Sequence, residues 1–153
     1  MKPIRNSAKA VIVEDRRLLC IQKEDEQGGY LILPGGGQER QEPLRDTLRR
    51  ECLEEIGAEV EIGDLRFVRE YISNNHEFAH EEPDLHNIDF MFACALAPGA
   101  RIGNGSMPDE GQLGVVWVPL ADLERERLYP LSLARALAAG EWDGVPVYLG
   151  DVN

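Results

Sequence analysis

No hydrophobic run in this sequence is long enough to cross a membrane. The longest, FMFACALA at residues 90–97, is far shorter than the roughly 20 apolar residues that a spanning helix needs. The N-terminal stretch MKPIRNSAKAVIVEDRR has no apolar core before Glu14 interrupts it, so it does not resemble a secretory signal. We therefore expect a soluble protein of the cytoplasm.

Cysteine is scarce and poorly placed for cross-linking. The chain has three, Cys20, Cys52 and Cys94, which stand far apart in apolar stretches. An odd number without metal-ligand spacing argues against a disulfide framework or a structural zinc site. We expect three unpaired thiols that pack as small hydrophobic side chains in a reducing compartment.

Basic residues are also scarce relative to acidic ones. The sequence has 16 Lys and Arg against 28 Asp and Glu, a formal charge of −12. Such a chain repels the phosphate backbone of nucleic acids and anionic membrane surfaces, so neither is expected as a bulk partner. An anionic small molecule is still compatible with this charge, because a bound divalent cation inverts the local field.

The pattern of apolar residues and turn signals predicts strands around one central helix. At 153 residues, we expect residues 1–153 to form a single domain with a buried core. The helix follows Pro43, ends at Gly57 and repeats apolar residues every four positions. This order predicts an α/β or α+β sandwich with a mixed sheet. The expected strands lie at residues 8–23 (a hairpin turning at 15–17), 30–33, 59–73, 87–96 and 114–120, with further helices at 121–128 and 131–140.

The sequence RRECLEEIG, residues 49–57, places three glutamates at the end of this helix. At about 100° per residue counted from Leu44, Glu51, Glu54 and Glu55 fall at about 340°, 280° and 20°. Two of the three therefore border the apolar stripe, and Leu53 lies opposite the stripe, where a solvated face would put the acids. Carboxylates that converge beside a core repel one another and lose solvation unless a positive group offsets both costs.

A hard divalent cation with oxygen ligands meets that requirement. The spacing i, i+3, i+4 lets three side chains converge on one point. Glutamate-rich helix ends are common, however, so a solvated acidic end is the alternative on this helix alone. The preceding sequence favours the metal: Gly35, Gly36 and Gly37 end a strand, and their backbone can approach a substrate closely because glycine has no Cβ.

The stretch from Gly36 to Ala58 resembles the signature of the Nudix hydrolases, G-x5-E-x7-R-E-U-x-E-E-x-G-U, where U is bulky and apolar. Every fixed position matches; the departures are Cys52 and Ala58, which are small for the two U positions and affect packing. The segment DEGQLGVVWVPLADL, residues 109–123, is similar to the tryptophan strand of the family. The resemblance implies the Nudix α/β/α sandwich with a mixed central β-sheet.

The resemblance also implies a reaction: hydrolysis of a nucleoside diphosphate linked to another moiety, by attack of water on phosphorus, with Mg²⁺ or Mn²⁺. By this likeness Glu54 and Glu55 are metal ligands, and Glu51 is a further ligand or the general base. The carbonyl of Gly36 is expected to complete the metal shell. Arg50 is expected to orient a carboxylate by a charge-assisted hydrogen bond.

Two more acids have weaker assignments. Glu42, in the signature, is expected as an outer metal ligand. Glu110 stands in the loop before the tryptophan strand, where some family members carry one more ligand or base, and a solvated loop acid is the alternative. The family's substrate markers downstream of the signature do not match this chain. Phe67, Tyr71 or Phe78 can stack a base, with packing in the core or loop as the alternative.

The segment HEFAH, residues 76–80, matches the zinc-peptidase pattern H-E-x-x-H. That pattern works when both histidines lie on one face of a helix, whereas here Pro83 and a polar surrounding sequence oppose a long helix. A zinc peptidase is therefore a remote alternative. A loop on the substrate side, in which His76, His80 and His86 contact phosphate or a base, is the more attractive hypothesis, with a solvated loop as the alternative.

Two questions stay open at this level. A Nudix domain that binds a nucleotide without cleaving it is the alternative to an enzyme, although such sensors usually carry a damaged signature. Nudix domains are often homodimers, and by that analogy VPVYLG, residues 145–150, is a candidate strand for a dimer interface.

Overall fold

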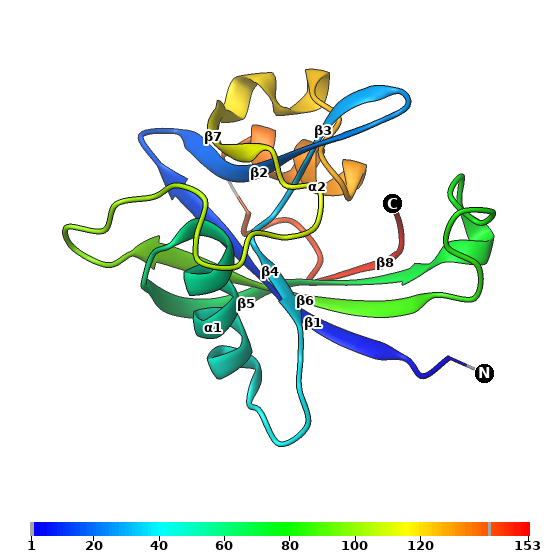
Figure 1. The fold of residues 1–153 in the computed structure, drawn as a ribbon. Coiled ribbons are helices and arrows are strands. Elements are labelled where there is room, and N and C mark those ends of the chain that lie inside the picture. Colours follow the sequence, from blue (N-terminus) through cyan, green and yellow to red (C-terminus); the bar gives the residue numbers. More distant parts are fainter. Residues whose placement is uncertain (1, 141) are drawn as a thin grey trace.

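The computed structural model of this chain describes residues 2–140 and 142–153 (Figure 1). Its strands form one eight-stranded mixed sheet. The elements, in chain order, are β1 (Arg5–Glu14), β2 (Arg17–Asp25), β3 (Gly28–Ile32), β4 (Gly35–Gly37), α1 (Leu44–Ile56), β5 (Val60–Ile72), the 3₁₀-helix η1 (Ser73–Asn75), β6 (His86–Leu96), β7 (Gly114–Pro119), the 3₁₀-helix η2 (Leu120–Arg125), α2 (Leu131–Ala138) and β8 (Tyr148–Asp151).

The long strand β1 organises the sheet because both of its edges are used. One edge pairs in parallel with β6, and the other pairs with β4 near its start and with β2 at its end. Beyond these, β5 lies between β6 and β8, and β2 lies between β3 and β7. The second edge of β1 thus divides between two partners, which leaves the short β4 beside the start of β1.

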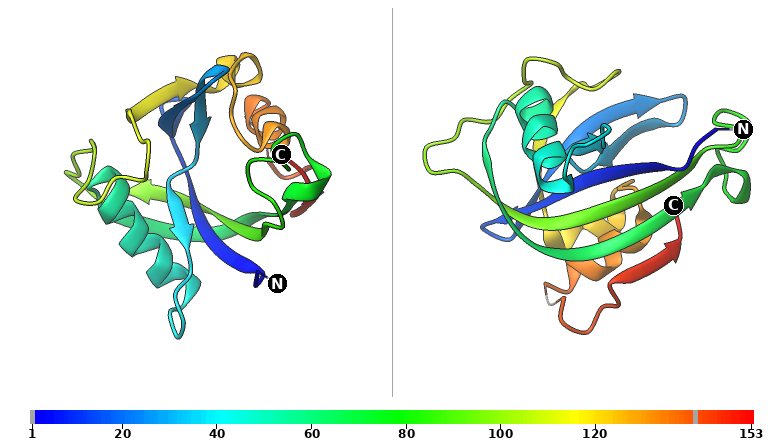
Figure 2. Two further views of the ribbon diagram at one scale, coloured as in Figure 1. Left: turned by 45° about the vertical axis from the view of Figure 1, so that its right-hand side comes forward. Right: turned by 90° about the horizontal axis from the view of Figure 1, so that it is seen from below.

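Alternate residues of β1 enter two separate cores. Ala8, Ala10 and Ile12 pack with the buried face of α1, whereas Val11 packs with α2 and η2 on the other side of the sheet. The view from below in Figure 2 shows α1 over one face and α2 over the other. This arrangement confirms the predicted sandwich of helices around a mixed sheet.

Several local predictions need correction. The glycines after Pro34, which were expected only to end the preceding strand, form the strand β4 and pair with β1. Residues 120–125 form a 3₁₀-helix in place of the first turns of an α-helix. The strand expected within 145–150 begins only at Tyr148 and pairs in parallel with β5; its role in a dimer interface stays a prediction.

The three cysteines are all free. Cys20 and Cys52 are buried, and Cys94 is half-buried. Burial raises the pKa of the Cys20 thiol to about 12, so it stays protonated and packs as an apolar group.

In residues 2–140 and 142–153, the structure contains no helix that is both long and apolar enough to span a bilayer.

The glycine strand is held so close to β1 that it has no room for a side chain. A Cβ on Gly35 would lie 2.1 Å from the carbonyl oxygen of Ala8, and the residue has a φ of 137°. We therefore predict that Gly35→Ala lowers the free energy of unfolding by roughly 1–3 kcal/mol, measured by chemical denaturation. The matched control is Gly103→Ala, since a Cβ there meets no atom within 4 Å. Equal stability of the two variants would contradict the pairing of β4 with β1.

Candidate active site

The helix α1 presents its glutamates as the helical wheel predicts. Leu48, Cys52 and Ile56 are fully buried, and Glu55 beside them is only 4% exposed. Leu53, on the opposite side, is 46% exposed. The helix ends at Gly57, whose φ of 68° is the left-handed conformation expected there. The acids therefore face the sheet edge at β4, away from open solvent.

Two glutamates of α1 reach the backbone of the glycine strand. The N–H of Gly35 donates a hydrogen bond to Oε2 of Glu55 at 3.3 Å. The carboxylate of Glu51 lies against Gly36, because a Cβ on that glycine would come within 2.5 Å of the Glu51 Cδ atom. A residue larger than glycine would push Glu51 away, so these contacts join the glycine strand and the acidic helix into one site.

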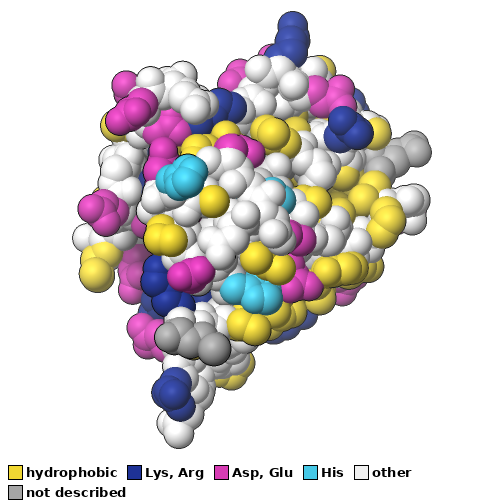
Figure 3. Space-filling view, turned by 90° about the vertical axis from the view of Figure 1, so that its right-hand side faces the viewer, with side chains coloured by type: hydrophobic (Ala, Val, Ile, Leu, Met, Phe, Trp, Pro, Cys, Tyr) yellow, Lys and Arg dark blue, Asp and Glu magenta, His cyan; other side chains and the backbone are white. Residues whose placement is uncertain are grey.

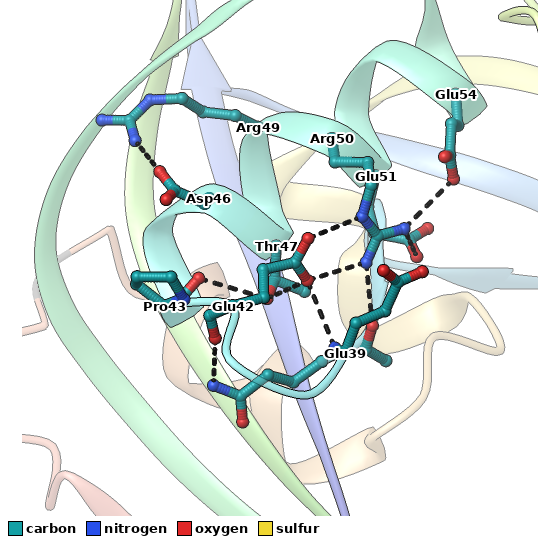
Figure 4. A network of polar contacts seen from close by, with 11 residues as sticks. Glu39, Glu42, Pro43, Asp46, Thr47, Arg49, Arg50, Glu51 and Glu54 are labelled. Carbon is teal, nitrogen blue, oxygen red and sulfur yellow. Dashed lines mark hydrogen bonds and ion pairs between the residues drawn. The ribbon is translucent and has the colours of Figure 1, made fainter.

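Arg50 lies at the centre of a network of carboxylates (Figure 4). Its Nη1 donates to Oε1 of Glu51 at 2.9 Å and to Oε2 of Glu54 at 3.4 Å. Its Nη2 donates to the carbonyl of Gly37 at 3.1 Å. One guanidinium therefore orients two glutamates and the end of the glycine strand, the geometry expected for an arginine that positions acids.

Glu42 completes this network as a structural partner of Arg50. Its carboxylate accepts two hydrogen bonds from Arg50, both at 2.9 Å. It also accepts from the hydroxyl of Thr47 at 2.7 Å and from the N–H of Glu39 at 3.2 Å. The hydrogen bonds from Arg50, followed by that from Thr47, lower the pKa of Glu42 to about 2. With its oxygens engaged in this way, Glu42 fastens the loop before α1 to the helix.

A loop after β6 fixes the C-terminal end of α1. The last carbonyls of a helix have no partners within the helix. Here the N–H of Gly105 donates to the carbonyl of Glu55 at 3.1 Å, and the N–H of Met107 donates to that of Glu54 at 2.8 Å. The side chain of Gln112 also donates to the Glu55 carbonyl, at 2.8 Å. These bonds hold the backbone that carries both glutamates.

Glu110 belongs to the same loop but is exposed on a turn between Asp109 and Gln112. Within the described residues its side chain makes no hydrogen bond or ion pair. Its neighbour Asp109 pairs with Lys23 at 2.7 Å. The loop is thus anchored near the glutamates through Gln112, and the role expected for Glu110 stays a prediction.

Burial gives Glu55 unusual titration behaviour. Loss of solvent raises the pKa of this carboxyl to about 8. The charge of Lys9 and the N–H of Gly35 oppose the shift, and the neighbouring Glu51 adds to it. A buried carboxylate of this kind is stabilised in its charged form by a nearby cation.

The described part of the chain contains no group of three His, Cys, Asp or Glu side chains already arranged around a metal position. The reason lies in the contacts above. Arg50 holds Glu51 and Glu54, while Glu55 points to the N–H of Gly35. A cation placed among these acids would take over part of the role that the guanidinium fills here.

The histidines lie on a different part of the molecule, in and beside the loop between β5 and β6 (Figure 3). The Nε2 atom of His76 is 2.7 Å from Oδ1 of Asp151, and that of His86 is 2.8 Å from Oε2 of Glu70. His80 is exposed. Residues 76–80 form turns and no α-helix, so the zinc-peptidase alternative is wrong: its two histidines do not share a helix face. The expected substrate contacts of His76 and His80 stay predictions.

Two adjoining cavities that share Arg69 and Tyr129 form a polar cleft, which runs across the sheet from Lys9, beside the glycine strand, towards Asn87. Gly37, Ser7, Asp89 and Arg69 lie side by side on β4, β1, β6 and β5. Arg69 donates to the buried Asp89 at 2.7 Å. In the adjacent row the Lys9 ammonium donates to the carbonyl of Gly35 in β4, at 3.4 Å. Cations therefore begin at the glycine strand and continue into the sheet.

No motif in the sequence points to this cleft. Lys9 and Asp89 interrupt otherwise apolar strands, and polar residues within a buried strand are the signal that points to a lined cavity. Of the aromatic residues considered for base stacking, Phe67 is buried in the core, whereas Tyr71 and Phe78 line a cavity at the far end of the cleft.

A family model described as "NUDIX domain" matches residues 3–138. The chain therefore belongs to the Nudix family, and it is a Nudix-type pyrophosphohydrolase that acts on phosphoric anhydride bonds. No curated protein sequence matches it.

Solved structures agree with this membership. A MutT NUDIX hydrolase from Burkholderia pseudomallei is 26% identical, covers 87% of this chain and 96% of its own, and superposes with a TM-score of 0.66. A NUDIX hydrolase from Nitrosomonas europaea is 18% identical over 92% of each chain, with a TM-score of 0.68. An ADP-ribose pyrophosphatase from Streptococcus suis is 21% identical over 96% of this chain and 98% of its own, with a TM-score of 0.61.

The contacts of Glu42 predict how stability depends on pH. Its folded pKa of about 2 lies below the ordinary 4.5, so its contribution is complete above 4.5 and is lost as the pH falls towards 2. Glu42→Gln should lower the free energy of unfolding at neutral pH by roughly 1–2 kcal/mol. It should also make the loss of stability between pH 4.5 and 2 shallower. Thermal unfolding across this range tests both effects, with the exposed Glu124→Gln as control.

For Glu55 we predict the opposite dependence of stability on pH. Its folded pKa of about 8 lies above the ordinary 4.5, so without metal it destabilises the fold increasingly as the pH rises from 4.5 to 8. In metal-free buffer, Glu55→Gln should therefore unfold at a higher temperature than the unchanged protein, and the difference should grow across this window. Melting curves in the presence of a chelator measure it. Parallel pH profiles for the two proteins would show that Glu55 is not perturbed in this way.

Proposed function

We propose that this protein hydrolyses a nucleoside diphosphate linked to another moiety, with Mg²⁺ or Mn²⁺ as its cofactor. The observation that carries the proposal is that Glu51 and Glu55 reach the backbone of the glycine strand, while Arg50 ties Glu54 to Glu51. We further propose that residues 1–153 form one domain for this reaction, since β8 at the C-terminal end pairs with β5 of the sheet.

The residues present fit a hard divalent cation. Glu51, Glu54 and Glu55 supply carboxylate oxygens, and the backbone of Gly36 lies against Glu51. Burial raises the pKa of Glu55 to about 8, and a cation beside this carboxylate would favour its charged form. These three glutamates would hold the metal together with the Gly36 carbonyl. When bound, the ion neutralises the pyrophosphate and lowers the pKa of water.

The remaining roles belong to the protein's own groups. Arg50 orients Glu51 and Glu54, so both carboxylates keep a fixed direction as the substrate enters. Glu51, or Glu110 on its anchored loop, accepts the proton of the attacking water. Lys9, whose ammonium reaches the carbonyl of Gly35, supplies positive charge for the diphosphate at the glycine strand. Because the sheet fixes the position of Lys9, little reorganisation is needed during the reaction.

A non-catalytic nucleotide sensor is the competing function. It shares the fold and the cleft but would not need an intact acidic network. Here each fixed residue of the signature is present, and Arg50 contacts three glutamates at once. This completeness favours the enzyme.

The names of two similar structures suggest substrates to test. One is the ADP-ribose pyrophosphatase described above, and another is a UDP-X diphosphatase, which is 16% identical and has a TM-score of 0.65. Identities this low establish a common fold and leave the substrate open. We propose a small nucleotide or nucleotide-sugar derivative as the substrate class and the cytoplasm as the location, where the three free thiols would stay reduced.

We predict that Glu55→Gln abolishes metal-dependent hydrolysis without unfolding the protein, because it removes the charge that a cation requires while keeping the side-chain shape. The assay is a panel of nucleoside diphosphate derivatives with Mg²⁺ or Mn²⁺, read by release of phosphate or nucleotide. Addition of Mg²⁺ should also raise the unfolding temperature of the unchanged protein more than that of the variant.

Controls separate the outcomes. Glu61→Gln changes an exposed glutamate on β5 and should leave turnover unchanged. Full activity of the double variant Glu54→Gln, Glu55→Gln would refute the metal assignment. Binding of nucleotides by the unchanged protein without turnover of any compound in the panel would favour the sensor.

A further inference from the structure

The polar cleft ends in a cavity of 270 Å³ that has one aromatic wall and one polar wall. Tyr30, Phe78 and Tyr129 form the aromatic wall. The polar wall contains Tyr71 and Asn87, which are paired on the neighbouring strands β5 and β6. The volume is close to the lower end of the range for small-molecule sites, about 300 Å³. It suits a planar ring system with part of an attached sugar.

The aromatic wall is built as a fixed surface. Tyr30 and Phe78 each meet Tyr129 edge to face, with ring centroids 5.8 Å apart in both pairs. The guanidinium of Arg127 lies 5.2 Å from the Tyr30 ring and 5.5 Å from the Tyr129 ring, and it is paired with Asp25. All three rings are half-buried. They therefore offer ring surface to a ligand without having to rearrange.

The polar wall contains one acceptor without a partner. Most polar groups around it are satisfied: Asp89 accepts from Arg69 at 2.7 Å, and the Tyr71 hydroxyl donates to Glu82 at 3.4 Å. Oδ1 of Asn87 is buried and, within the described residues, has no hydrogen-bond partner. Buried polar atoms are nearly always paired, so a donor on a ligand is the natural partner for this oxygen.

The charge around the cavity determines which part of a nucleotide it accepts. Asp25, Glu81 and Glu82 line it, and the one cation on the polar wall, Arg69, is already bonded to Asp89 and to the carbonyl of Val152. A phosphate would be repelled here. An uncharged ring with N–H donors would be attracted by the same acceptors.

The opposite end of the cleft is suited to phosphate. A smaller cavity of 50 Å³ shares Arg69 and Tyr129 with the aromatic cavity and extends to Lys9. By strand register, Gly37 lies two strands across and two residues along from Asn87. With strands about 4.8 Å apart and about 3.3 Å per residue, that separation is about 12 Å. This is comparable to the length of a nucleoside diphosphate laid along the cleft.

We propose that the aromatic cavity binds the base of the substrate and that Asn87 selects a purine carrying an exocyclic amino group. This rests on the proposed function, because it takes the diphosphate to lie at the glycine strand. Tyr30, Phe78 and Tyr129 provide the stacking surface, whose breadth favours a purine. Oδ1 of Asn87 accepts a hydrogen bond from the amino group, so a base without that donor leaves the buried oxygen unpaired.

The test uses pairs of nucleoside 5′-monophosphates that differ in one amino group. AMP is compared with purine riboside monophosphate, and GMP with IMP, by calorimetric titration of the unchanged protein. A monophosphate has no anhydride bond, so its binding is independent of hydrolysis. We expect the amino-bearing member of at least one pair to bind about tenfold more tightly, and Asn87→Ala to remove that difference.

Three variants make the result specific. Asn75→Ala removes the same side chain from a position outside the cavity, where it bonds to Asp151, and should leave the preference unchanged. Asn87→Asp keeps an acceptor and should retain the preference. Tyr129→Leu should weaken all four ligands while preserving their order. Equal affinities within both pairs, or a preference that survives Asn87→Ala, would overturn the assignment whether or not the protein hydrolyses any compound.

Discussion

The site depends on one guanidinium placed among carboxylates. Arg50 contacts Glu42, Glu51 and Glu54 and also the carbonyl of Gly37. Without it, the acids at this end of α1 would repel one another beside an apolar core. With it, the loop before the helix, the helix itself and the glycine strand become one unit. The same cluster that stabilises the local fold thereby holds the carboxylates that we propose as metal ligands.

The second constraint is the division of β1 between two partners. Its start pairs with β4 and its end with β2, so the sheet has an edge beside which the acidic helix can reach backbone atoms. Only glycine allows this approach, since a Cβ on Gly35 or Gly36 would collide with Ala8 or Glu51. The strand β1 therefore both contributes to the two cores and positions the glycine strand beside the acidic helix.

The cleft changes character along its length. It begins at the glycine strand with Lys9, passes the buried pair of Arg69 and Asp89, and ends among aromatic and acidic side chains near Asn87. Such a gradient orients an elongated ligand whose charge is concentrated at one end. In our proposal, the position of these residues in the sheet sets the direction of the substrate, and the side chain of Asn87 selects its base.

The sequence by itself determined the family, the sandwich and the acidic helix, because these follow from local spacing: Gly36 to Glu55 lie within one strand, loop and helix, and apolar periodicity directs Glu51 and Glu55 towards the core. Tertiary structure decided the rest. In the folded protein the three glycines pair with β1, and Glu42 accepts hydrogen bonds from Arg50. The HEFAH segment lies in a loop without a helix, and Asn87 and Tyr129 line the same cavity. Those outcomes depend on pairing between strands that are distant in the chain, and the local pattern of one strand does not specify which distant strand will pair with it.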